Sequence, residues 1–308
     1  MSLLDPKLLA VVAAALDPDV RTASRLSRQF GFAGLLLDAA MPGLNLTDLS
    51  QSGRREIRQL LQSENQRLAA IRLDLGPNGI TPRTDLDKLL SRLDKTLDAA
   101  ASLGSTVVCL DAGPLPPPHE TSAPPKAVPE PTTAGRILLP SFDDLQSLVG
   151  VAAPPAAQSL QPDAAQVAAV DTAIEEFARR ADRFSITIAV SSELSSFASI
   201  QRIVSRYDAR QLALDLDSVA VIRDRWTLDQ ILSALGPRIV HVRLRDAAVG
   251  ADRRTAHVPL GRGSVPIAAL IASLTQGGYP GMFTVDTMEF PDRHAAAAAA
   301  RRFLVGSK

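Results

Sequence analysis

Several short segments of the chain combine apolar residues with charged side chains at alternating positions. In the stretch RIVHVRLRD, Arg238 to Asp246, the side chains of His241, Arg243 and Arg245 share one face if the segment is a β-strand. Other segments show the same alternation with acidic residues, namely Glu193, Asp215, Asp217 and Asp286. Carboxylates beside guanidinium groups can transfer protons, bind the oxygen atoms of a substrate or hold a divalent cation. These faces therefore predict a polar site.

Eight apolar segments, separated by segments of helical periodicity, are available to position these side chains. The expected strands are Leu8–Ala15, Ala33–Ala39, Ala69–Leu75, Thr106–Ala112, Ile186–Glu193, Gln211–Val219, Ile239–Asp246 and Met282–Met288. An open doubly wound sheet usually carries a glycine-rich turn after its first strand, and Ala15-Leu16-Asp17-Pro18 supplies none. The sequence therefore predicts an α/β fold, a (β/α)8 TIM barrel, as a single domain of residues 1–308.

One long connection interrupts this rhythm after the fourth expected strand. Residues 114–163 hold 12 of the chain's 22 prolines, so we expect a proline-rich loop insertion that is mostly irregular. Within it, Ile137 to Gly150 can form a short helix. Two interpretations stay open: a lid over the catalytic face of the barrel, or a flexible surface excursion.

The strand alternation also predicts which charged side chains face the barrel interior. The expected inward set is Asp38, Asp74, Asp111, Glu193, Asp215, Asp217 and Asp286, with Arg72, His241, Arg243 and Arg245. Charges in a poorly hydrated interior must be paired, protonated or bound to a cation, because isolation costs several kcal/mol each. A polar site at the carboxyl ends of the strands is one interpretation. A salt-bridge network that only neutralises itself is the other.

Composition excludes several other classes of protein. The 33 basic and 33 acidic residues balance, so no overall positive field favours nucleic acid or an anionic membrane surface. The one cysteine, Cys109, excludes an intrachain disulfide framework and fits a reducing compartment, so we expect a cytoplasmic protein. No apolar stretch reaches the roughly 18 residues of a membrane span, and the apolar run after Asp5 lacks the features of a signal peptide.

Five segments carry a family resemblance that covers nearly the whole chain outside the insertion. They read GFAGLLLD (31–38), ASLGSTVVCLDAG (101–113), LALDLDSVA (212–220), IVHVRLRD (239–246) and VPLGRGSVPIAALIASLTQGGYPGMFTVD (258–286). The chain resembles the xylose-isomerase-like TIM barrels, the sugar phosphate isomerase/epimerase family. The resemblance implies an isomerase or epimerase that acts on a sugar, polyol or related carbonyl compound by carboxylate-mediated proton transfer.

The resemblance also implies one divalent metal, but two of the four ligand positions depart from the family pattern. The strand-5 Glu falls on Ser191, the strand-6 Asp on Asp217, the strand-7 His on Arg243 and the strand-8 Glu on Asp286. An arginine has no lone pair to give a metal. We expect no metal cofactor, with the Arg243 guanidinium in the cation's place, paired with Asp217 and Asp286. The alternative is one Mg²⁺ or Mn²⁺ held by Glu193, Asp217 and Asp286.

Roles for the candidate residues follow from this resemblance. Glu193 and Asp286 are the expected catalytic acid/base pair, and the expected substrate-binding residues are Asp217, His241, Arg243 and Arg245. For His241, a satisfied interior histidine is the other interpretation. The expected partner is a small carbohydrate-like substrate, and the oligomeric state is not indicated. The alternative function is a non-catalytic TIM barrel that binds a carbohydrate or a protein partner, with ion pairs replacing the metal.

Overall fold

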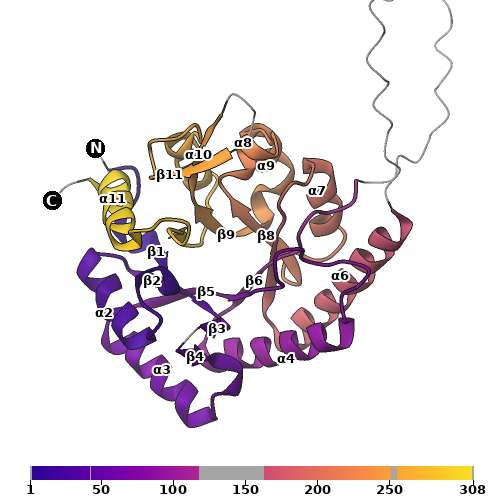
Figure 1. Cartoon of the computed structure of the whole chain (residues 1–308), viewed down its shortest axis with the longest axis horizontal. Coiled ribbons are helices and arrows are strands. Elements are labelled where there is room, and N and C mark those ends of the chain that lie inside the picture. The colour runs from indigo at the N-terminus through magenta and orange to yellow at the C-terminus, as the bar shows by residue number, and fades with distance from the viewer. Residues whose placement is uncertain (1, 42, 118–162, 251–254, 307–308) are drawn as a thin grey trace, which may run out of the picture.

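Eight parallel strands close into a barrel in the computed structural model, which describes residues 2–41, 43–117, 163–250 and 255–306. Around the barrel the order is β1-β12-β9-β8-β7-β6-β5-β2, so neighbours in the chain are neighbours in the sheet (Figure 1). The strands are β1 (Leu9–Val12), β2 (Gly34–Asp38), β5 (Arg67–Leu73), β6 (Val107–Asp111), β7 (Thr187–Ser191), β8 (Leu212–Asp217), β9 (Ile239–Leu244) and β12 (Phe283–Val285). The predicted (β/α)8 TIM barrel is confirmed.

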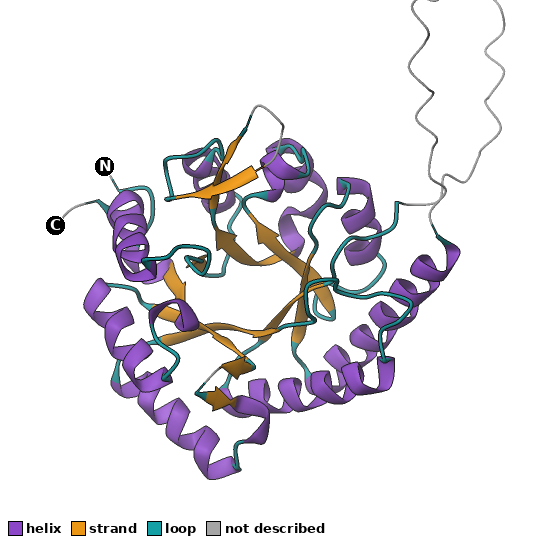
Figure 2. Ribbon diagram, viewed as in Figure 1, coloured by secondary structure: helices purple, strands orange, loops and turns teal. Residues whose placement is uncertain are grey.

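Helices surround the barrel on its outer side (Figure 2). They are α1 (Ala13–Leu16), α2 (Val20–Phe30), α3 (Gln51–Ser63), α4 (Leu86–Leu103), α6 (Ala164–Phe184), α7 (Phe197–Ser205), α8 (Ala220–Arg223), α9 (Leu228–Leu235), α10 (Ile267–Gln276) and α11 (Arg293–Val305). Single 3₁₀ turns cover Pro6–Leu8, Leu46–Asp48 and Gly236–Arg238.

Local sequence signals set the ends of these helices. In α2, the Asp19 carboxylate accepts a hydrogen bond from the Thr22 N–H at the N-terminus, and Gly31 ends the helix with φ +79°. In α4, Asp85 caps in the same way and Gly104 ends the helix with φ +81°. A side-chain acceptor at the N-cap satisfies a free N–H group, and glycine adopts a positive φ without steric cost. The turns that return the chain to the barrel are therefore encoded locally.

The main hydrophobic core lies between the strands and the helices, as the strand alternation predicts. Leu212, Leu214 and Leu216 of β8 are fully buried in this outer layer. A second, smaller cluster fills the inside of the barrel, with Val12, Ala15, Leu36, Ala70, Cys109 and Ala189. Small side chains leave room inside for the longer charged residues that share this interior. The packing therefore directs the charged set toward the barrel axis.

The structure corrects the first strand, which we expected to span Leu8–Ala15. It ends at Val12, and Ala13–Leu16 form α1. Alanine and leucine favour helix over strand, so the apolar run changes structure once its β-branched residues end. Two hairpins were also not predicted: β3 (Ala40–Met41) with β4 (Leu44–Asn45), and β10 (Asp246–Val249) with β11 (Thr255–Val258).

Both interpretations of the proline-rich insertion concern residues 118–162. These residues lie outside the described ranges, as does the expected helix Ile137–Gly150.

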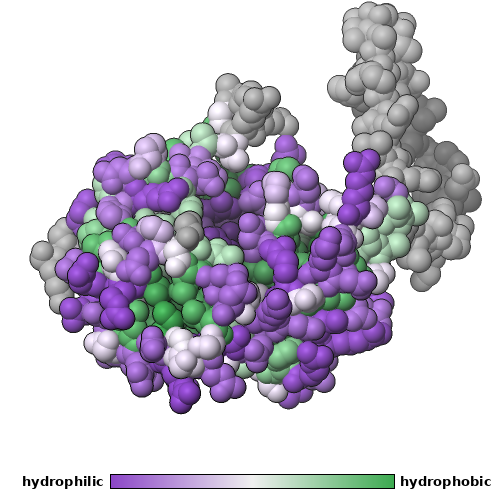
Figure 3. Space-filling view, turned by 60° about the horizontal axis from the view of Figure 1, so that its bottom comes forward, coloured by the Kyte–Doolittle hydropathy of each residue, from purple (hydrophilic) through white to green (hydrophobic). Residues whose placement is uncertain are grey.

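Within the described ranges, every helix is too short or too polar to cross a bilayer. Hydrophilic side chains cover much of the face that Figure 3 turns forward, with a hydrophobic area among them. Of the large hydrophobic side chains described, Leu194 and Val249 are the most exposed, at 71% and 47%.

Candidate functional site

A cavity of about 940 Å³ opens at the carboxyl ends of the barrel strands. Charged side chains from four different strands line it, including Asp38 of β2, Arg72 of β5, Asp111 of β6 and Arg243 of β9. Apolar side chains, among them Leu75, also line it. The strand ends are where TIM barrels position reactive groups. Several inward side chains that the alternation predicts are thus brought together around one space.

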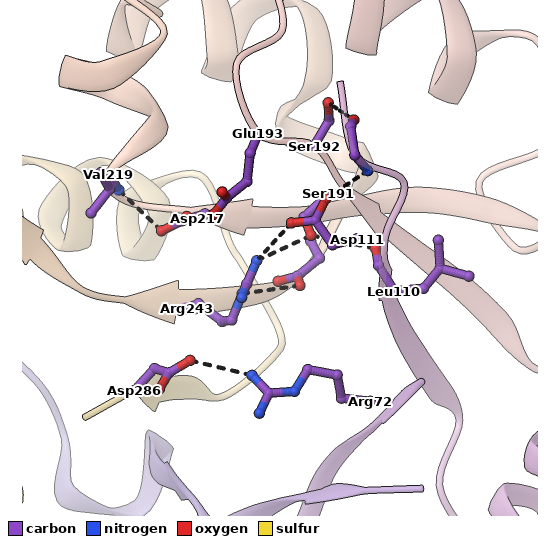
Figure 4. A network of polar contacts seen from close by, with 12 residues as sticks. Arg72, Leu110, Asp111, Ser191, Ser192, Glu193, Asp217, Val219, Arg243 and Asp286 are labelled. Carbon is purple, nitrogen blue, oxygen red and sulfur yellow. Dashed lines mark hydrogen bonds and ion pairs between the residues drawn. The ribbon is translucent and has the colours of Figure 1, made fainter. Parts of the chain in front are cut away.

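Arg72 pairs with two acidic residues that line this cavity. Its Nε lies 2.6 Å from Asp38 Oδ1. Its Nη1 lies 3.3 Å from Asp286 Oδ2 (Figure 4). The second oxygen of Asp286, Oδ1, accepts a hydrogen bond from the Met288 N–H at 3.1 Å. Asp286 lines the cavity with its side chain only 6% exposed. Arg72 and the backbone therefore hold this carboxylate in one orientation.

Arg243 is almost completely buried, and its partners differ from the predicted ones. Nε lies 3.3 Å from Asp215 Oδ2, while Nη2 donates to Ser191 Oγ at 3.0 Å and lies 4.0 Å from Asp111 Oδ2 (Figure 4). The expectation that Arg243 pairs with Asp217 and Asp286 is wrong. Asp217 is its register neighbour on β8, but the side chain pairs with Asp215, two residues earlier on that strand, and reaches on toward β6 and β7.

Arg245 occupies the position beside Asp217. Its Nε donates to Asp217 Oδ1 at 3.2 Å, and its Nη2 contacts Asp217 Oδ2 and, at 3.2 Å, Glu193 Oε1. The Arg223 guanidinium adds a second contact to Glu193 at 3.1 Å. Burial opposes the ionisation of Asp217, but the charges of Arg245 and Arg243 outweigh it and hold the pKa of Asp217 far below its ordinary value. The result is a bidentate, buried ion pair.

Glu193, the other expected acid/base residue, lies farther out than Asp286. Its side chain is 46% exposed and is paired with two arginines, and it is not among the residues that line the cavity of about 940 Å³. It comes two residues after the end of β7, in a turn where Leu194 adopts φ +57°. Its catalytic role stays a prediction that this placement does not favour.

His241 is a satisfied interior histidine. Nδ1 lies 2.7 Å from Asp215 Oδ1, Nε2 lies 2.9 Å from Thr284 Oγ1, and the residue is 1% exposed. Because both ring nitrogens are engaged and the ring does not line the cavity, the geometry gives it no access to a substrate. Through Asp215 it instead helps to fix the buried end of Arg243.

Asp111, at the end of β6, is the site residue that sequence reasoning did not single out. It lines the cavity, its side chain is 34% exposed, and burial raises its pKa above the ordinary value although Arg243 opposes this. The Gly113 N–H donates to its Oδ1 at 2.8 Å and fixes its orientation. The alternation placed Asp111 inward, but no pattern distinguished it from the other inward acids. A carboxyl group with a raised pKa beside a guanidinium can accept and return a proton.

The mouth of the barrel does not fit a divalent cation in this arrangement. The three carboxylates expected to hold Mg²⁺ or Mn²⁺, those of Glu193, Asp217 and Asp286, each have an arginine as an ion-pair partner. Both Asp217 oxygens already accept hydrogen bonds from Arg245. A cation here would have to displace these guanidinium groups and stand against their charge. We therefore derive no chemical step through a metal.

Comparisons with known proteins agree with this architecture. A family model described as xylose isomerase-like TIM barrel matches residues 25–305. No curated protein matches the sequence. A xylose isomerase domain protein from Planctomyces limnophilus superposes with a TM-score of 0.65 at 14% identity, covering 96% of this chain and 95% of that one. A 3-keto-D-glucoside 4-epimerase from E. coli gives 0.61 at 15% identity, with 96% and 98% covered. A D-tagatose 3-epimerase-like protein gives 0.62 at 12% identity, with 96% of each chain covered. At these identities the likeness shows the fold.

Proposed function

The chain belongs to the xylose isomerase-like TIM barrel family, and we propose that it is an isomerase or epimerase that moves a proton at the carbon beside the carbonyl group of a sugar-like compound. The observation that carries this proposal is the pairing of Asp111 and Arg243 in one cavity. Asp111 has a raised pKa because it is partly desolvated, and the buried Arg243 guanidinium lies 4.0 Å from it. A base and a fixed positive charge are what enolisation requires.

In the proposed reaction, the Asp111 carboxylate removes the proton from the carbon next to the substrate carbonyl. The electrons of that C–H bond form a carbon–carbon double bond, and the carbonyl oxygen becomes an enolate oxygen. Arg243 stabilises this oxygen, because among the described residues no hydrogen-bond partner occupies its Nη1. Isomerisation results when the proton returns to the former carbonyl carbon while the hydroxyl proton of the adjacent carbon moves to the enolate oxygen, so that the adjacent carbon becomes the new carbonyl. Epimerisation results when the proton returns to the original carbon from the opposite face and the carbonyl is re-formed. Asp286, oriented by Arg72, is the second acid/base candidate.

The lining of the cavity favours a polyhydroxylated substrate. Carboxylates such as Asp38 and Asp286 accept hydrogen bonds, whereas Arg72 and Arg243 donate them, and sugar hydroxyl groups can do both. A volume of about 940 Å³ is at the upper end of the range for small-molecule pockets, so a substrate larger than one sugar unit fits. One structural neighbour, the 3-keto-D-glucoside 4-epimerase, is named for a substrate of this class.

Solvent exchange tests the proposal. The purified protein is incubated in deuterium oxide with a panel of ketoses, aldoses and keto-glycosides, and deuterium at carbon is measured by mass spectrometry. We expect incorporation into at least one compound. Asp111→Asn should lower the rate by at least about 100-fold, as expected on loss of a general base. The control Asp208→Asn, at an exposed carboxylate outside the cavity, should keep the rate. Exchange into no compound, or equal rates in wild type and Asp111→Asn, would contradict the proposal.

A non-catalytic binding barrel is the second candidate, and one observation favours it. Arg245 and Arg223 pair with Asp217 and Glu193 in a network that fills the mouth beside the cavity without involving a substrate. This candidate expects a sugar of the same panel to bind, measured by titration calorimetry, with no deuterium exchange in any compound. Exchange that depends on Asp111 would exclude it.

A further inference from the structure

A side pocket of about 450 Å³ adjoins the candidate site near the carboxyl ends of β1 and β12. The two strands are neighbours in the barrel, and α1 and α11, which follow them, pack against each other. Residues 14–18 line one side of this pocket, and residues 290–294 line the other. Ala14, Pro18 and Arg293 line both the side pocket and the cavity of about 940 Å³. A ligand in the cavity can therefore extend into the side pocket.

The side pocket offers a mainly apolar surface. Six of its ten lining residues are apolar, namely Ala14, Ala15, Leu16, Pro18, Phe290 and Pro291. The four polar ones are already engaged by the backbone: the carboxylates of Asp17 and Asp292 each accept a hydrogen bond from a backbone N–H, at 2.8 and 2.9 Å. Arg293 Nε donates to a carbonyl oxygen at 3.2 Å, and the His294 ring contacts the carbonyl oxygen of Leu16. Recognition in this pocket therefore depends chiefly on carbon surface.

The walls of the side pocket are held in place before a ligand binds. The contact of His294 with the Leu16 carbonyl oxygen joins one wall to the other. The Phe290 N–H donates to the Thr287 carbonyl oxygen at 3.2 Å, and the next residue, Pro291, has a restricted φ. A preformed pocket binds a ligand without the entropic cost of ordering its walls.

We propose that the substrate is a keto-glycoside whose sugar ring lies between Asp111 and Arg243 and whose aglycone, an apolar alkyl or aryl group, lies in the side pocket. This inference rests on the proposed function. The charged groups of the cavity suit hydroxyl groups, whereas the side pocket suits carbon, so a ligand that is polar at one end and apolar at the other matches both. A second sugar unit in the side pocket would place hydroxyl groups against carbon without hydrogen-bond partners.

A glycosidic bond also restricts the class of reaction. The anomeric carbon of a glycoside is an acetal, so the carbonyl group that Arg243 polarises stands at another ring carbon. Asp111 then removes the proton from a ring carbon beside that carbonyl group. A proton that returns to the same carbon from the opposite face inverts it and re-forms the carbonyl group, while the glycosidic bond stays intact. The reaction is therefore an epimerisation within the ring rather than an aldose–ketose isomerisation.

Matched glycosides test the side pocket without any turnover. Methyl and phenyl glycosides of glucose, galactose and mannose, in both anomeric forms, have no carbonyl group and so bind without reacting. In at least one pair, titration calorimetry should show that the phenyl glycoside binds at least about 10-fold more tightly than the methyl glycoside, because an aromatic ring leaves water. Equal affinities in every pair, or binding of no glycoside, would overturn the proposal.

Two variants, each checked for folding by circular dichroism, assign this preference to the side pocket. Phe290→Ser removes its aromatic side chain, and Pro291→Glu places a carboxylate at its exposed edge without removing buried packing. Each should reduce the preference for the phenyl glycoside to less than about 3-fold and leave the affinity for the methyl glycoside unchanged. The control Leu194→Ser changes a side chain that is 71% exposed and lines neither space, so it should keep the preference. A preference that survives in both folded variants would also overturn the proposal.

Deuterium exchange distinguishes failure of this inference from failure of the proposed function. A preference for phenyl glycosides, without exchange in any keto-glycoside, would refute the proton transfer and support the aglycone site. Exchange that depends on Asp111, with no preference for phenyl glycosides, would refute the aglycone site alone.

Discussion

Replacing Asp217 with asparagine should destabilise the folded protein by about 3–5 kcal/mol at pH 7, the cost of removing one partner of a buried ion pair. Asp217 is 3% exposed and Arg245 is 9% exposed, so water cannot replace the lost charge. The half-exposed Glu193 would be the acidic partner left to Arg245 within salt-bridge distance. Arg245→Met should cost a similar amount. The double variant should cost about as much as one single variant, because each half of the pair loses its value without the other.

The contribution of Asp217 to the free energy of unfolding should decrease as the pH falls. Since the pKa of Asp217 is held far below its ordinary value of 3.8, its contribution to stability is complete above that value and is lost as the pH falls through the lower pKa of the folded state. Urea unfolding, followed by circular dichroism at pH 7, 5 and 3, measures this. The difference between wild type and Asp217→Asn should be equal at pH 7 and 5 and smaller at pH 3. The exposed control Glu56→Gln should leave the midpoint unchanged. A change below about 0.5 kcal/mol at pH 7, or a difference that is independent of pH, would refute the reasoning.

Three further predictions concern the groups around the site. Asp111→Asn should stabilise the protein at pH 7, because burial raises the pKa of Asp111 and disfavours its ionised form. The increase in the urea midpoint should vanish below pH 3.8, where the carboxyl group is protonated in both the folded and the unfolded state. A lower midpoint at pH 7 would contradict this reasoning. Gly79→Ala should lower the free energy of unfolding in urea by more than about 2 kcal/mol, because φ is +58° and a Cβ would lie 2.2 Å from the carbonyl oxygen of Ala112. At Gly104 a Cβ would meet no atom within 4 Å, so Gly104→Ala should cost only about 1 kcal/mol. Equal costs would exclude the steric cause. Asp246→Ala should lower the free energy of unfolding by about 3 kcal/mol or more, since its carboxylate accepts hydrogen bonds from three backbone N–H groups of the turn between β11 and α10. Hydrogen exchange of those three amides should become faster in the variant. Unchanged exchange would show that the turn keeps its structure without Asp246.

The sequence alone predicts the barrel and the face of each strand on which a side chain lies. In β9, Val242 and Leu244 pack outward while His241 and Arg243 point inward, as the alternation predicts, because a period of two residues fixes the side of every strand residue. The end of β1 was not predicted, because a short continuous apolar run fits a buried strand as well as a buried helix by its periodicity.

The pairing of charges was beyond the sequence. Asp217 and Arg243 are neighbours in register, yet Arg245 takes Asp217 and Arg243 reaches across to Asp215 and Asp111. Which long side chain reaches which carboxylate depends on the stagger of the strands and on side-chain conformation. For the same reason Asp111 was one inward acid among several until its burial and its position beside Arg243 were visible.

The central claim is that guanidinium groups occupy the mouth of the barrel in place of a divalent cation, and Mn²⁺ titration of the wild type beside the double variant Arg243→His/Arg245→Met tests it most directly. Manganese prefers oxygen and imidazole ligands, which are the donors that this variant presents at the mouth. Arg245 has to be removed as well, because it holds both oxygens of Asp217. Calorimetry should show no stoichiometric binding to the wild type and one ion per chain in the double variant, where the new histidine lies beside the freed Asp217. One tightly bound Mn²⁺ in the wild type, lost in the double variant, would contradict the account.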